Sequence, residues 1–150
     1  MVAVTPDIPG QHKLPTTVSR SVPVADLPWH PTPFPGIEQK ILLRDEERGL
    51  ITALIRMAPG ARLPLHEHAD IEQTYVLEGS LADDEGNDIT AGNYIWRPAG
   101  HRHVAWSPRG ALLIGIFLKP NVFLEENAAP IGVTAGSKLP AKPSMSPIFG

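Results

Sequence analysis

Short apolar segments separated by turn residues dominate the middle of the chain. The predicted segments span residues 37–43, 50–57, 72–79, 80–88, 92–100, 103–107 and 111–118, with Gly, Pro and Asp between them. Their spacing of about 8–12 residues is typical of an all-β sandwich or barrel. No window sustains the i, i+3, i+4 pattern of a helix. Helical turns are predicted only in "NVFLEENAA" (121–129), beyond the barrel.

Proline sets the N-terminal region apart from this pattern. Eight of the 17 prolines come before Gly36. Each fixes φ and removes a backbone donor, so neither a helix nor a central strand fits there. We predict an extended arm (1–36), a barrel (37–118) and a C-terminal extension (119–150). Trp29 and Phe34 in the arm are expected to pack on the barrel or on a partner subunit.

Composition narrows the classes of partner and of chemistry. The chain has 150 residues, with 13 Lys and Arg against 16 Asp and Glu and no basic run, which argues against a nucleic-acid partner. It has no cysteine, so any metal must be held by nitrogen and oxygen. The N-terminus lacks a secretory pattern, and the longest apolar run, 111–118, is far short of the ~20 residues that span a bilayer. We expect a soluble, cytoplasmic protein.

Two histidines and a glutamate in "GARLPLHEHADIEQTYVLEG" (60–79) have the spacing of metal ligands. His66 and His68 lie two apart, roughly 6.5 Å along one face of a strand, so both rings can point inward. Glu72 has the same parity, and a turn at 69–70 would place it across from them.

A second segment, "GNYIWRPAGHRH" (92–103), offers a further ligand. Pro98 and Gly100 predict a tight turn that leaves His103 at the start of a strand. His101 has the same parity and competes with it. Histidines from two hairpins with a carboxylate between them are typical of an N/O metal site.

Together these segments resemble the paired motifs of the cupin superfamily, G-x5-H-x-H-x3,4-E-x6-G and G-x5-P-x-G-x2-H-x3-N. The matching residues are Gly60, His66, His68, Glu72 and Gly79 in the first and Gly92, Pro98, Gly100 and His103 in the second. Ser107 replaces the final Asn, which is not a ligand. The resemblance implies a small jelly-roll barrel of the double-stranded β-helix type that holds one divalent ion. It also implies four ligands, His66, His68, Glu72 and His103, with His101 near the rim.

The segments "LPWHPTPFPGIEQKILLRD", "APGARLPLHEH" and "YVLEGSLADDEGNDITAGNYIWRPAGHRH" are similar to the ChrR-like branch of cupins. That branch includes acetylacetone-cleaving and dihydroxyacetophenone dioxygenases, and the sensor half of zinc anti-sigma factors. An anti-sigma role requires an added helical zinc domain, which the proline arm cannot form. The likeness implies a homodimeric Fe(II) dioxygenase that cleaves a C–C bond in a small β-diketone or hydroxyketone.

Several alternatives stay open at this stage. With Ni(II), Mn(II) or Zn(II) the site could serve a hydrolase or isomerase, and without turnover it could serve a small-ligand-binding module. Glu72 is either a ligand or a general base. Arg56 is either a substrate contact or a solvated residue at the rim. Aromatic residues near the site, Tyr94, Trp96 and Trp106, would line the cavity or belong to the core or an interface. Arg97 and Arg102 are expected at the rim.

Overall fold

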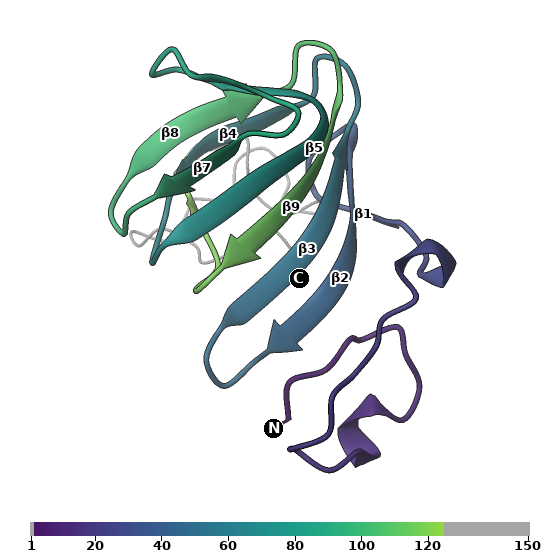
Figure 1. Ribbon diagram of the computed structural model, residues 1–150. Coiled ribbons are helices and arrows are strands. Elements are labelled where there is room, and N and C mark those ends of the chain that lie inside the picture. The colour runs from purple at the N-terminus through teal and green to yellow at the C-terminus, as the bar shows by residue number, and fades with distance from the viewer. Residues whose placement is uncertain (1, 125–150) are drawn as a thin grey trace, which may run out of the picture.

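Figure 1 shows the computed structural model, which describes residues 2–124. The strands are β1 (His30–Pro31), β2 (Ile37–Asp45), β3 (Leu50–Met57), β4 (Arg62–Glu67), β5 (Glu72–Asp83), β6 (Asp88–Thr90), β7 (Tyr94–Arg97), β8 (Arg102–Trp106), β9 (Ala111–Phe117) and β10 (Val122–Phe123). Short 3-10 turns occur at Gln11–Lys13 and Val24–Asp26. The predicted all-β architecture is confirmed. No helix in residues 2–124 is long and apolar enough to cross a membrane.

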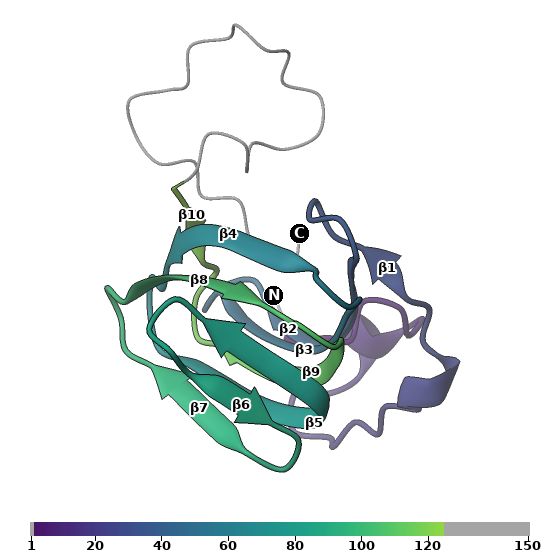
Figure 2. The same ribbon diagram turned by 90° about the horizontal axis from the view of Figure 1, so that it is seen from above.

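The strands form one strongly curled antiparallel sheet in the order β1-β2-β3-β9-β5-β8-β4-β10, with β6 and β7 also paired to β5. Figure 2 shows how the curl brings the β4 and β8 wall over the β3 and β9 wall. The two walls enclose the interior. Buried residues of β3 and β9 alternate with outward-facing ones, so every second side chain of each strand points inward. Their inward side chains, such as Ile55, Leu113 and Phe117, belong to one apolar core.

The long strand β5 belongs to both walls. Its first part pairs with β7 and β9, and its last residues pair with β6 and β8. The change of partner follows a bulge between Val76 and Glu78. Gly79 adopts φ +70° there, and a Cβ atom at this position would lie 1.9 Å from the carbonyl oxygen of Gly110. Only glycine fits so close to the neighbouring backbone.

The N-terminal arm lies on the outside of the barrel's own strands. Strand β1 pairs with β2, and Val4 forms an isolated bridge with Arg44. The Phe34 side chain is buried in the core. Trp29 lies under the Arg56 guanidinium, 4.1 Å from the ring centroid. Both aromatic residues of the arm therefore contact the same chain that carries them.

The segment after β9 differs from the expectation. Helical turns were predicted from residue 121, but Val122–Phe123 is a strand paired with β4, so this prediction was wrong. A strand of two residues is too short to produce a periodic pattern in the sequence. Phe123 is buried beside His66 by tertiary packing. The remainder of the predicted helical segment, from residue 125, lies outside the described residues.

Candidate metal centre

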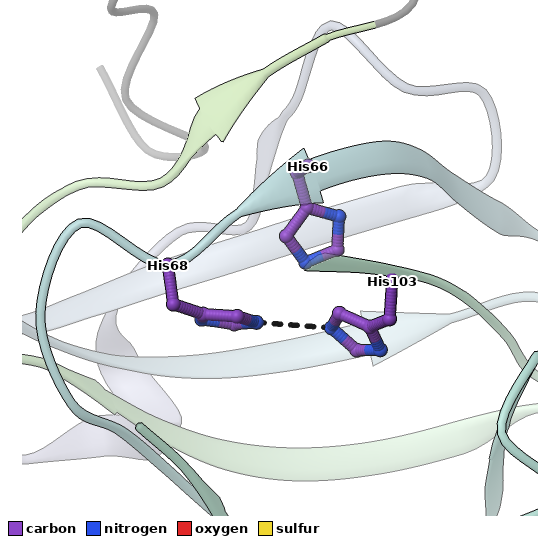
Figure 3. Close-up of side chains that lie close together, drawn as sticks. All are labelled: His66, His68 and His103. Carbon is purple, nitrogen blue, oxygen red and sulfur yellow. Dashed lines mark hydrogen bonds between the residues drawn. The ribbon is translucent and has the colours of Figure 1, made fainter. Parts of the chain in front are cut away.

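Three histidines converge inside the barrel. His66 comes from β4, His68 directly follows it, and His103 comes from β8. Each is at most 2% exposed, and one ring nitrogen of each lies within 4.8 Å of the others. Figure 3 shows the rings facing one another, with His68 Nε2 3.0 Å from His103 Nε2. An ion bound at about 2.1 Å to each nitrogen requires only small side-chain rotations from this arrangement.

Strand pairing explains why residues far apart in sequence meet here. His66 lies directly opposite His103 in the β4–β8 ladder. Side chains on directly opposed residues of an antiparallel pair point to the same face. A bulge between Leu63 and His66 sets the register, and the His68 amide donates to the His101 carbonyl at 2.9 Å. Strand pairing and this hydrogen bond therefore hold the two histidine-bearing segments together at the site.

Short polar contacts of the outer ring nitrogens orient two of the histidines for an ion. His66 Nδ1 lies 2.7 Å from the Pro64 carbonyl oxygen, to which it can donate, and this leaves Nε2 free. His68 Nδ1 lies 2.8 Å from Glu72 Oε2, and this leaves its Nε2 directed at His103. Such outer partners fix the tautomer of metal-bound histidines. The donor set and its orientation fit a divalent ion.

Burial keeps the imidazoles of His66 and His103 neutral. It lowers the pKa of His66 to about 4, although the nearby Glu72 carboxylate offsets part of the effect. Burial, reinforced by the positive charge of Arg97, lowers the pKa of His103 to about 2. Both rings are unprotonated at pH 7, which is the form that binds metals.

Glu72 lies behind His68, outside the group of three converging nitrogens. Its Oε2 contacts His68 Nδ1 and accepts from Asn121 Nδ2 at 3.2 Å, and its Oε1 accepts from Thr74 Oγ1 at 3.0 Å. Burial raises the pKa of this carboxyl, but the contacts with His68 and Arg97 outweigh burial and hold the pKa well below its usual value. Glu72 is thus an ionised, fully engaged carboxylate.

Arg97 is buried, so the expectation that it lies at the rim was wrong. It is 2% exposed, its Nη2 lies 2.9 Å from Asp83 Oδ2, and its Nη1 lies 3.9 Å from Glu72 Oε1. The cause is strand parity: Tyr94 and Trp96 point outward on β7, so Arg97 points inward. The sequence signal for this burial was the presence of two acidic residues on β5, Glu72 and Asp83, since a buried positive charge requires negative partners.

The remaining predicted residues are not part of the group of three converging nitrogens, although the His101 ring lies 5.2 Å from that of His103. Arg56 is on the outer face of β3, where it pairs with Glu38 at 2.6 Å and covers Trp29. His101 Nε2 lies 3.5 Å from Glu85 Oε2 and is not one of the three converging groups. Trp96 and Tyr94 are 58% and 52% exposed, so neither lines the interior. Arg102 is largely exposed beside Glu67.

A small cavity of about 20 Å³ adjoins the cluster. Its lining residues are Ile55, Leu63, His66, Glu72, Thr74, Leu81, Arg97, His103, Ala105, Leu113 and Phe117. This volume accommodates about one water molecule. A larger ligand must therefore displace apolar side chains of the walls, while Arg97, Glu72 and the histidines supply the polar contacts.

Comparison with protein families gives one clear match. The family described as the ChrR Cupin-like domain matches residues 18–121, which include about half of the arm and the whole predicted barrel (37–118). A search among curated proteins finds no significant match.

Solved structures share the fold. An acetylacetone dioxygenase from Acinetobacter johnsonii is 23% identical, covers 77% of this chain and 85% of its own, and gives a TM-score of 0.68. A candidate acetylacetone dioxygenase from Methylibium petroleiphilum is 24% identical over 79% of this chain and 90% of its own, also with a TM-score of 0.68. The anti-sigma factor ChrR of Rhodobacter sphaeroides, solved with SigE, is 24% identical over 63% of this chain and 50% of its own, with a TM-score of 0.53. At these identities the three structures establish the shared cupin β-barrel.

Proposed function

Because the chain belongs to the ChrR cupin-like family, we propose that it is a metal-dependent enzyme, an Fe(II) dioxygenase that cleaves a C–C bond in a small β-diketone or hydroxyketone. The observation that carries the proposal is the buried cluster of three histidines beside a cavity. Two structural neighbours described as acetylacetone dioxygenases supply the candidate reaction.

His66, His68 and His103 would hold the ion. Three neutral imidazoles leave its charge uncompensated and leave positions open for other ligands. Bound Fe(II) would supply dioxygen chemistry, whereas Ni(II), Mn(II) or Zn(II) would act as a Lewis acid. Arg97, beside the same cavity, presents a positive charge to the oxygen atoms of a bound diketone or enolate.

For Glu72 we propose an orienting role, in place of a ligand or a general base. Both of its oxygens already accept contacts, and the one nearest the cluster faces His68 Nδ1. A general base works best with a pKa near the operating pH, and the pKa of Glu72 is held far below it. A carboxylate bound to the outer nitrogen of a ligating histidine instead raises its basicity and fixes the ring.

Oxygen consumption tests the proposed reaction. Protein reconstituted anaerobically with Fe(II) is expected to consume acetylacetone and dioxygen in equimolar amounts, because both oxygen atoms enter the cleaved fragments. An oxygen electrode and mass spectrometry with labelled dioxygen measure this, with Zn(II)-loaded protein as the control. Turnover that proceeds without oxygen would favour a hydrolase or isomerase. Tight binding without turnover would favour a binding module.

We also propose that the protein is a homodimer, on the evidence of an apolar outer face on β5 and β7. Tyr75, Leu77, Tyr94 and Trp96 are 43%, 39%, 52% and 58% exposed, and Tyr75 lies opposite Tyr94 in the ladder. The Tyr94 hydroxyl donates to Gln73 Oε1 at 2.9 Å, so this polar group is satisfied within the face. An aromatic patch of this kind is typical of an interface core. A second copy presents the same patch, and a two-fold axis would bury both.

Light scattering coupled to gel filtration tests this assembly. The wild type is expected to elute as a dimer and a Tyr94→Glu/Trp96→Glu variant as a monomer, because charge is costly in a buried interface. Leu14→Glu is the control, since Leu14 is a similarly exposed apolar residue in the arm. A monomeric wild type, or a variant that stays dimeric, contradicts the proposal.

A further inference from the structure

The segment that follows β9 reaches the metal centre from outside the two histidine motifs. Strand β10 adds to the edge of β4, with Phe123 opposite His66 and Val122 opposite Glu67. The Leu124 amide donates to the Leu65 carbonyl at 2.9 Å and extends this contact. Figure 2 shows β10 lying beside β4 at the barrel wall.

Phe123 covers the back of the first histidine. Its ring centroid lies 5.4 Å from that of His66 and 4.6 Å from that of Phe34 in the arm. Phe34 and Phe123 are both buried. The two regions that flank the predicted barrel therefore meet behind one histidine of the cluster.

Asn121 reaches the second histidine through Glu72. It is 1% exposed, and its Nδ2 donates to Glu72 Oε2 at 3.2 Å. The same oxygen lies 2.8 Å from His68 Nδ1. The carboxylate oxygen that orients His68 is thus itself held by the Asn121 amide. Asn121 Oδ1 has no hydrogen-bond partner among the described residues, so within them the side chain is held by its hydrogen bond to Glu72.

We propose that Asn121 is a positioning residue of the metal centre, which fixes the Glu72 carboxylate and through it the His68 ring. The inference rests on the proposed metal site. A neutral amide suits this place, because it donates to the carboxylate without adding a positive charge that would weaken the contact of Glu72 with His68. An aspartate at this position has the same shape, but its ionised carboxylate has no hydrogen-bond donor and would repel the Glu72 carboxylate.

Metal affinity and the spectrum of bound Co(II) test the role. Asn121→Ala and Asn121→Asp are expected to bind Co(II) about 10–100-fold more weakly than the wild type, the usual effect of losing an outer partner of a ligand. Their Co(II) absorption bands should also shift, because His68 is less well oriented. The matched control is Asn93→Ala, since Asn93 is exposed on the β6–β7 turn and its side-chain amide donates to Thr90, away from the three histidines.

The thermal stability of the metal-free proteins separates positioning from simple packing. A lowered melting temperature with wild-type Co(II) affinity and spectrum would overturn the proposal and assign Asn121 a structural role. Equal weakening in Asn93→Ala would overturn it as well. A wild type that binds no Co(II) would overturn the proposed metal centre and this inference together, so the two failures are distinguishable.

Discussion

Replacing His103 with alanine is expected to abolish stoichiometric binding of a divalent ion while the barrel stays folded. The affinity should fall by more than about 100-fold, which is the upper end of the effect of losing only an outer partner. His103 supplies one of three converging nitrogens, and its loss leaves only His66 and His68 from the other strand. Its Nδ1 has no hydrogen-bond partner in residues 2–124, so few hydrogen bonds within this part of the chain are lost with the ring.

Thermal shift with and without metal measures this effect. Binding to the native state alone stabilises the wild type by RT ln(1 + [L]/Kd), so added metal should raise its melting temperature and leave that of the variant unchanged. His101→Ala is the matched control, because its ring lies 5.8 Å from His68 yet outside the cluster. Loss of the shift in His101→Ala, with its retention in His103→Ala, would reverse the assignment.

The sequence predicts that His66, His68 and His103 point into the barrel, because the direction of each side chain is set locally. Strand alternation directs His66 inward, and the turn at residues 98–100 returns the chain so that His103 pairs opposite it. The direction of each side chain follows from spacing within its own segment, whereas the pairing of β4 with β8 joins distant parts of the chain. The fold class follows in the same way from short segments and turn residues.

The surroundings of the ligands could not be predicted in this way, because they depend on distant partners. Arg97 was predicted to lie at the rim because it flanks a turn. Only the pairing of β7 with β5 places Glu72 opposite it. Asn121 lies after the last long strand, and only the addition of β10 to β4 brings it to Glu72. Arg56 occupies an outward position of β3, where its contacts are Glu38 and the arm residue Trp29. Contacts of this kind are set by tertiary packing, not by local pattern.

The buried arginine is expected to matter most for stability. Replacing Arg97 with methionine should lower the free energy of unfolding by about 3–5 kcal/mol, because it leaves buried carboxylates without their positive partner. Asp83 is 3% exposed and Glu72 is 8% exposed, so water cannot replace the guanidinium. Arg102→Met is the control, since Arg102 is largely exposed beside Glu67 and such pairs contribute at most about 1 kcal/mol. Urea unfolding measures both.

The pH dependence of that loss identifies its cause. Burial raises the pKa of Asp83, but hydrogen bonds from Asn87 and the contact with Arg97 outweigh it and leave the pKa below the ordinary value. The folded state thus releases the proton more readily than the unfolded state. The resulting stability is present above the unfolded pKa, near 3.8, and is lost as the pH falls through the folded value. In Arg97→Met the carboxyl takes up its proton at higher pH, so acid unfolding should begin at a higher pH than in the wild type.

A double substitution decides whether the ion pair or the volume of the side chain is responsible. Asp83→Leu in the Arg97→Met background removes the uncompensated charge, and buried ion pairs replaced by apolar residues are often tolerated. The double variant should therefore be more stable than Arg97→Met alone, with a coupling free energy of about 0.5–3 kcal/mol. Strictly additive losses would mean that the two side chains act separately. The inward orientation of Arg97 would then reflect packing of β7, and the charge balance beneath the histidines would have to come from elsewhere.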